Sequence, residues 1–148
     1  MAESGATDDL RVAVVVAGFN ETITDGLLQG ALTTLAECGI AEPFVVRVSG
    51  SFELPVVARA LAESGHDCVV ALGAVIKGET DHYEHIGTQA AAGLQMVAIE
   101  TGVPVGFGVL TTRTVEHARA RSRPGPGNKG AEAAEAAVGA ARLLRRLR

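Results

Sequence analysis

Aromatic residues are scarce in this sequence of 148 residues, which contains no tryptophan, one tyrosine and four phenylalanines. Cysteine is equally scarce. Cys38 and Cys68 lie far apart in the sequence, and they match neither a metal-binding nor a redox spacing. We therefore expect two buried, unpaired thiols, the usual state of cysteine in a reducing cytosol.

Long apolar runs and a basic charge excess are also missing. No run approaches the length of a membrane-spanning helix, and the polar, acidic residues 1–9 do not resemble a signal peptide. The formal net charge is −4, and no cluster of basic residues alternates with aromatic ones, which argues against a nucleic-acid surface. We expect a soluble, cytoplasmic protein with a disordered tail over residues 1–9 and one domain over residues 10–148.

Apolar runs rich in β-branched residues alternate with segments of helical periodicity. The predicted strands cover residues 10–17, 44–48, 67–76 and 103–110, and the predicted helices cover residues 22–37, 52–64, 81–101, 115–121 and 129–147. This order predicts an α/β fold in three layers, in which a four-stranded parallel sheet has helices on both faces. Pro104 near the start of the last strand predicts that this strand lies at an edge.

The last predicted helix has two unusual features. Small apolar residues between Ala131 and Ala141 cover most of its faces, so we expect contacts from more than one side, some of them from another subunit. Arginines gather at its end, from Arg142 to Arg148. They could contact nucleic acid, but cations near a helix C-terminus also complement its dipole, and we favour that interpretation.

Ligands of open parallel sheets bind at the carboxyl ends of the strands, and every predicted strand end here carries unusual residues. Phe19 follows the first strand, Phe52 follows the second, and Phe107 is assigned to the end of the fourth. Phenylalanines are usually core residues. Three of them at one rim, beside polar turns, instead predict a flat slot for a planar ring.

The third strand leads into Gly78-Glu79-Thr80, which opens the longest predicted helix. Amide groups at a helix N-terminus favour an anion, and Thr80 could either cap the helix or donate to a phosphate. His82 follows in the first turn, where a general acid or base is plausible beside Glu79 and Asp81. A metal site formed by Glu79, Asp81, His82 and His85 is the disfavoured alternative, because the spacing matches no known helical ligand pair.

Two further features concern phosphate. The sequence has neither the G-x-G-x-x-G nor the G-x-x-x-x-G-K-[ST] pattern, which argues against dinucleotides and nucleoside triphosphates as ligands. Arg121 and Lys129 flank a loop that contains Pro124 and Pro126. Fixed cations around such a loop commonly bind phosphate or carboxylate groups, although a solvated charged loop would have the same composition.

Five motifs occur in order: GFN at 18–20, GSFELP at 50–55, GAVIKGETDH at 73–82, PVGFGVLTT at 104–112 and GNKG at 127–130. Together they closely resemble the 6,7-dimethyl-8-ribityllumazine synthase family, from about Leu10 to the C-terminus. The resemblance implies a flavodoxin-like fold and the penultimate step of riboflavin biosynthesis. In that step 5-amino-6-(D-ribitylamino)uracil condenses with 3,4-dihydroxy-2-butanone 4-phosphate, without metal or cofactor.

The resemblance also implies roles for individual residues. The pyrimidine would contact the stacking ring and its neighbours, namely Phe19, Asn20, Ala74, Val75 and Ile76. The ribityl chain would contact Ser51, Phe52 and Glu53. The phosphate would bind Glu79 and Thr80, with Arg121 as its main cation, and His82 would transfer protons. Phe107 and the catalytic Lys129 would reach the site from the neighbouring subunit, and Arg121 could also belong to another subunit.

Assembly is the last implication of the resemblance. Members form pentamers, decamers or icosahedral shells of sixty subunits, and the length of the loop from Arg121 to Lys129 favours the shell. Such a shell could enclose riboflavin synthase. Asp81 departs from the family pattern and adds negative charge near the predicted phosphate site. A non-catalytic lumazine- or flavin-binding shell protein is the alternative, but His82, Arg121 and Lys129 together favour the enzyme.

Overall fold

Four parallel strands form the middle layer of the molecule in the computed structural model, which describes residues 9–80 and 82–148. They are β1 (Val12–Ala17), β2 (Phe44–Val48), β3 (Cys68–Ile76) and β4 (Val105–Thr112), in the order β2-β1-β3-β4. The edge position predicted for the last strand is confirmed. This strand begins two residues later than predicted, because Pro104 contributes only its carbonyl, which accepts from the Val69 N–H at 2.9 Å.

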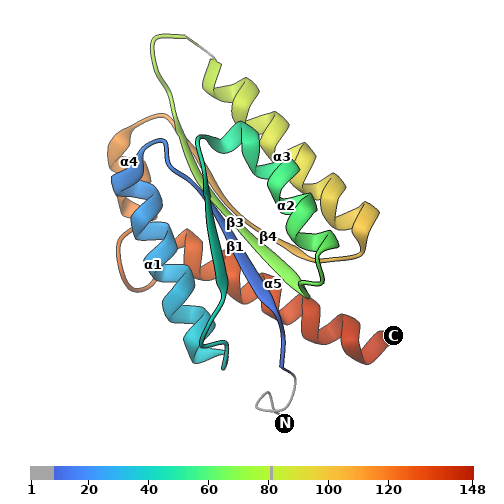
Figure 1. Ribbon diagram of the computed structural model, residues 1–148. Coiled ribbons are helices and arrows are strands. Elements are labelled where there is room, and N and C mark those ends of the chain that lie inside the picture. The colour runs from blue at the N-terminus through green and yellow to red at the C-terminus, as the bar shows by residue number, and fades with distance from the viewer. Residues whose placement is uncertain (1–8, 81) are drawn as a thin grey trace.

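Helices cover both faces of the sheet, as the alternation predicts (Figure 1). Helices α1 (Glu21–Glu37), α4 (Val115–Ala120) and α5 (Lys129–Leu147) lie on one face. Helices α2 (Leu54–Glu63) and α3 (His82–Thr101) lie on the other face. The predicted second helix begins differently, since a 3₁₀ turn, η2 (Ser51–Glu53), precedes α2.

The core consists of two apolar clusters separated by the sheet. Successive side chains of β1 point to opposite faces, so Val14 packs with α1 and α5 whereas Val15 packs with α2 and α3. Strand β3 has a neighbour on each side and helices on both faces, and every residue from Cys68 to Val75 is buried. Packing on both faces therefore fixes the position of the strand ends, where the predicted site lies.

A glycine shortly after the end of α1 reverses the chain. Gly39 has a φ of 91°, its N–H donates to Ala36 O at 3.0 Å, and the Ile40 N–H donates to Leu35 O at 2.8 Å. These two bonds form a Schellman motif, for which glycine is the favoured residue. Ile40 then joins the core, so the chain reverses toward β2 at a fixed place.

The C-terminal arginines bind other parts of the chain. Arg142 donates to Cys38 O at 2.7 Å, Arg145 lies 3.3 Å from the Asp67 carboxylate, and Arg148 donates to Gly102 O at 3.1 Å.

Both cysteines are free, and burial raises the pKa of the Cys68 thiol to about 12. None of the helices in residues 9–80 and 82–148 has the length and hydropathy needed to cross a membrane.

Candidate active site

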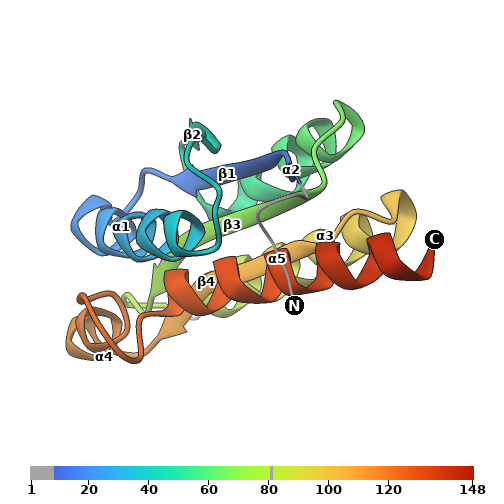
Figure 2. The same cartoon turned by 90° about the horizontal axis from the view of Figure 1, so that it is seen from below.

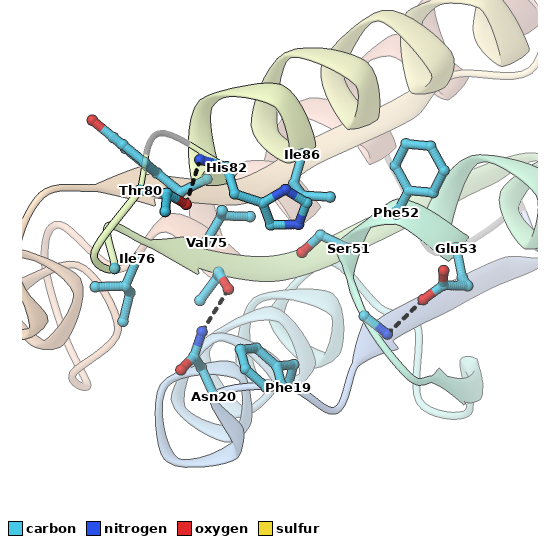
Figure 3. Close-up of a pocket in the computed structure, with 14 residues that line it drawn as sticks. Phe19, Asn20, Ser51, Phe52, Glu53, Val75, Ile76, Thr80, His82 and Ile86 are labelled. Atoms are coloured by element: carbon cyan, nitrogen blue, oxygen red, sulfur yellow. Dashed lines mark hydrogen bonds between the residues drawn. The ribbon is translucent and has the colours of Figure 1, made fainter.

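A pocket of about 450 Å³ opens at the carboxyl edge of the sheet, where the sequence predicts a ligand. We call it the rim pocket. Its walls come from the turn after β1, from η2, from the end of β3 and from the start of α3 (Figure 3). The lining residues include most of the predicted site: Phe19, Asn20, Ser51, Phe52, Glu53, Ala74, Val75, Ile76, Thr80 and His82.

The turn after β1 presents an exposed aromatic ring. Phe19 is 72% exposed, although phenylalanine usually lies in a core. The turn is fixed because the Phe19 N–H donates to Ser49 O at 3.0 Å, extending the ladder between β1 and β2. Asn20 takes up the left-handed backbone conformation, with a φ of 63°, and its Nδ2 donates to Ala74 O at 2.8 Å (Figure 3). The ring is therefore held beside the end of β3.

Helix η2 forms the opposite wall. The Glu53 carboxylate accepts from the Gly50 N–H at 2.9 Å, which closes this turn. Ser51 is buried against β3, and it fits there because position 73 is glycine: a Cβ on Gly73 would overlap the Ser51 hydroxyl. Phe52 stays exposed at the mouth of the pocket. This wall thus offers a hydroxyl, a carboxylate and peptide groups to a polyhydroxylated chain.

The start of α3 brings polar groups to the end of β3. The Thr80 hydroxyl accepts from the N–H of His82, the first residue of α3, at 3.3 Å, while its own proton remains able to donate to an anion. The imidazole of His82 lines the pocket (Figure 3). Val75 and Ile76 lie at the strand end in the same view. A proton-transfer group and a helix N-terminus therefore adjoin one apolar floor.

Four predicted residues lie outside the rim pocket: Glu79, Phe107, Arg121 and Lys129. Arg121 and Lys129 line a separate depression of about 340 Å³, together with Thr111, Thr112 and His117. We call it the cation depression. The Arg121 guanidinium donates to His117 O at 3.2 Å, and the Lys129 ammonium lies 3.1 Å from the Glu132 carboxylate.

The prediction that Phe107 lies at the rim is wrong for a single chain. Phe107 is the third residue of β4 and pairs with Ala71 in the middle of β3. It is 48% exposed, because β4 is an edge strand, and with Lys129 it borders another hollow, between β4 and α5. The strand continues to Thr112, so the motif that contains Phe107 ends at the rim but does not begin there.

The motif contains two acidic residues, and the structure describes only the first of them. Glu79 is exposed and does not line the rim pocket, and Asp81 falls outside the described residues, as does the predicted tail up to residue 8. Within the described residues, no three His, Cys, Asp or Glu side chains gather as a metal site requires.

Tyr83 and Ile86 line the rim pocket but were not predicted as site residues. Ile86 follows His82 by one helical turn, and that spacing was the available signal, because residues i and i+4 share a helix face. Tyr83 is buried, and its hydroxyl donates to the Glu84 carboxylate at 3.2 Å.

Comparison with known proteins gives a consistent result. The family model described as 6,7-dimethyl-8-ribityllumazine synthase matches residues 9–145. The chain is 52% identical over 139 residues to the protein of that name from Streptomyces avermitilis, covering 93% of this chain and 86% of the relative. It is 51% identical over 138 residues to the Thermus thermophilus protein of that name, covering 91% and 88%. A Caulobacter vibrioides relative, 6,7-dimethyl-8-ribityllumazine synthase 1, is 50% identical over 141 residues, covering 93% and 92%.

Proposed function

This chain belongs to the 6,7-dimethyl-8-ribityllumazine synthase family, and we propose that its rim pocket is where it carries out the penultimate step of riboflavin biosynthesis. The step condenses 5-amino-6-(D-ribitylamino)uracil with 3,4-dihydroxy-2-butanone 4-phosphate and releases phosphate and water. One observation carries the proposal: an exposed ring, a polar turn, a helix N-terminus and an imidazole adjoin a single cavity, in the order of the family motifs.

The pocket walls suit the two parts of the pyrimidine substrate. The heterocycle would stack on Phe19, whose face is exposed, and lie along the end of β3 at Ala74 to Ile76. The ribityl chain would extend along η2, where Ser51 and Glu53 offer hydrogen-bonding groups. This orientation brings the substrate amine toward the start of α3.

Residues around His82 suit the chemistry. The amine adds to the ketone and water leaves to form an imine, then phosphate departs, and attack of the second amine with loss of water closes the ring. Each step moves a proton, and His82 lies where it can accept one and return it. Thr80 and the amides at the start of α3 would bind the phosphate. Positioning and proton transfer account for such catalysis without a cofactor.

The cations would come from a second subunit. Phe107 lies on β4, Arg121 directly follows α4 and Lys129 begins α5, whereas the rim pocket lies between β1, β3 and α3. A head-to-tail contact that seats the β4 edge of one chain on the pocket of the next would join them, and such contacts close into rings. The ring would also cover exposed apolar side chains of α2 and α3, including Val56, Met96 and Ile99.

We infer that these rings are pentamers and that they assemble into a shell of sixty subunits. The loop between Arg121 and Lys129, whose length resembles that of the shell-forming relatives, supports this state. The two free thiols suit a reducing compartment such as the cytoplasm. Riboflavin synthase, which consumes the product, is the partner such a shell could enclose. Light scattering would show a shell as one large species; a species of a single ring would contradict it.

The test of the function is turnover by the purified protein. With both substrates supplied, we expect the absorbance of the lumazine product to appear together with stoichiometric phosphate. No product with both substrates present would contradict the proposal. The non-catalytic alternative predicts tight flavin or lumazine binding without turnover; the synthase names of the relatives do not favour it.

A further inference from the structure

Asn128 is a buried polar side chain at the base of the loop that carries both cations. It is 2% exposed, and it caps α5 by accepting from the Ala131 N–H at 3.0 Å. Its Nδ2 faces Arg123 O at 3.0 Å, Ser122 O at 3.1 Å and Gly26 O at 3.2 Å. One amide group therefore ties three parts of the chain together: the loop, α1 and α5.

The orientation of this amide is fixed by chemistry. A carbonyl oxygen only accepts, so the nitrogen of Asn128 must face the three carbonyls and the oxygen must face the Ala131 N–H. The two protons on Nδ2 are shared among those three carbonyls. An aspartate has the same shape, but it would set a negative charge against them. Both Nδ2 protons are used by these carbonyls and the side chain is buried, so any role in the reaction is indirect.

Glycines let α1 and α5 approach each other closely around Asn128, on the same face of the sheet (Figure 2). A Cβ on Gly30 would overlap the Asn128 amide, and a Cβ on Gly26 would overlap Ser122 O. A Cβ on Gly130 would overlap Leu27 O. The loop and the start of α5 therefore pack directly against the backbone of α1.

The two cations flank the segment that Asn128 holds. Arg121 comes directly before the anchored Ser122, and Lys129 comes directly after Asn128. The Lys129 N–H also donates to Arg121 O at 2.8 Å, which joins the two ends of the loop. Both side chains are exposed and line the cation depression. Their separation is thus set by backbone that the buried amide immobilises.

We infer that Asn128 is a positioning residue that fixes the spacing of the Arg121 and Lys129 charges for the phosphate-bearing substrate. The inference rests on the proposed function, since it assigns those cations to the butanone phosphate. A purely structural Asn128 would affect stability and all kinetic constants alike. A positioning Asn128 affects the phosphate-bearing substrate selectively.

Two pairs of variants of the assembled protein test this. Gly30→Ala pushes on the amide from α1 while leaving Asn128 unchanged, and Gly139→Ala is its control, because a Cβ there meets nothing within 4 Å. Asn128→Ser removes the three donated bonds but keeps a capping oxygen. Val138→Ala is its control for lost core packing, since Val138 is buried on the same helix and lies away from the loop.

We expect Gly30→Ala and Asn128→Ser to raise KM for butanone phosphate about tenfold and to leave KM for the pyrimidine substrate within about twofold. The controls should change neither constant. Equal changes in both constants, or no change beyond the controls, would refute the positioning role. If Asn128→Ser does not assemble, Gly30→Ala carries the test.

Calorimetry with inorganic phosphate separates this inference from the proposed function. We expect both variants to bind phosphate about tenfold more weakly than the unmodified protein, whether or not turnover occurs. If both variants bind phosphate more weakly but the unmodified protein shows no turnover, the positioning role stands and the proposed function is refuted. Normal turnover with unchanged phosphate affinity in both variants would refute the positioning role alone.

Discussion

The two halves of the site are built in different ways. The pocket half, formed by the residues that line the rim pocket, uses the ends of three adjacent strands, and hydrogen bonds between those strand ends hold its turns. The edge half, formed by Phe107, Arg121 and Lys129, lies along β4 and the loop after α4, and one buried amide anchors that loop. The pocket half is concave and apolar, whereas the edge half is open and charged.

This difference is the reason we propose that the reaction needs both halves. Among the described residues, none of those lining the rim pocket is a lysine or an arginine, so the pocket offers a phosphate hydroxyl and amide donors and the His82 imidazole. The edge half has both cations, but the cation depression that they line is separate from the rim pocket. Since binding of the phosphate dianion is strongest with charged donors, we assign binding of the ring to the pocket half and binding of the phosphate to the edge half.

Removal of the imidazole should have the largest effect on the pocket half. His82→Ala should lower kcat about a hundred- to ten-thousand-fold, the usual contribution of a general acid or base. Assembly should be unaffected, because His82 is exposed and donates only its backbone N–H to Thr80. Steady-state kinetics and gel filtration check both parts; kcat within about threefold of the parent would remove His82 from the chemistry.

Removal of a cation from the edge half should have the next largest effect on activity, and it should affect only the use of butanone phosphate. Arg121→Ala should lower kcat/KM for butanone phosphate about a hundredfold, because we propose that the guanidinium pairs with the phosphate. KM for the pyrimidine substrate should change little. Arg121→Lys is the matched control: it keeps the charge but loses the bidentate geometry, so it should recover part of the activity. Unchanged use of butanone phosphate in Arg121→Ala would contradict the assignment.

Removal of the exposed Phe19 ring should affect the pyrimidine substrate and not butanone phosphate. Phe19→Ala should raise KM for the pyrimidine substrate about tenfold, because stacking and apolar contact are both lost. Phe19→Leu keeps apolar area without a ring, so its KM for the pyrimidine substrate should lie between those of the unmodified protein and Phe19→Ala. Parallel measurement of both KM values gives the comparison with Arg121→Ala. An equal effect on butanone phosphate would show that the two halves do not divide the substrates.

Loss of the hydrogen bond between Asn20 and β3 should have the smallest effect on substrate binding. Asn20→Gly keeps the left-handed backbone but loses the bond to Ala74 O, so KM for the pyrimidine substrate should rise about threefold. Asn20→Ala also forces an alanine into that backbone conformation, and it should unfold at a lower temperature than Asn20→Gly. The unfolding temperatures of the two variants measure the cost of the left-handed conformation for alanine. Equal temperatures would show that this conformation has no such cost at position 20.

The pocket half could be predicted from sequence because its residues follow strands, and the carboxyl ends of parallel strands lie at one edge. Apolar runs located β1 and β3, and the residues directly after them therefore fell at the rim. Ile86 and Tyr83 were missed because they lie on the helix that follows, where their orientation depends on how α3 packs on the sheet.

The edge half was harder to predict because its placement depends on long-range packing. Phe107 was assigned to the rim because the last strand was expected to end at residue 110, but β4 extends to Thr112 and leaves Phe107 near its start. The role of Asn128 was not visible, because its partner Gly26 is 102 residues away and the two helices must pack before they meet. Strand periodicity carries no information about such contacts.

Subunit mixing tests the division of the site between two chains most directly. His82→Ala damages only the pocket half, and Arg121→Ala damages only the edge half. When equal amounts are dissociated and reassembled together, about one site in four should combine an intact pocket from one chain with an intact edge from its neighbour. We predict recovery of about a quarter of the activity of the unmodified protein. Activity no higher than the sum of the two separate variants would contradict a site shared between subunits.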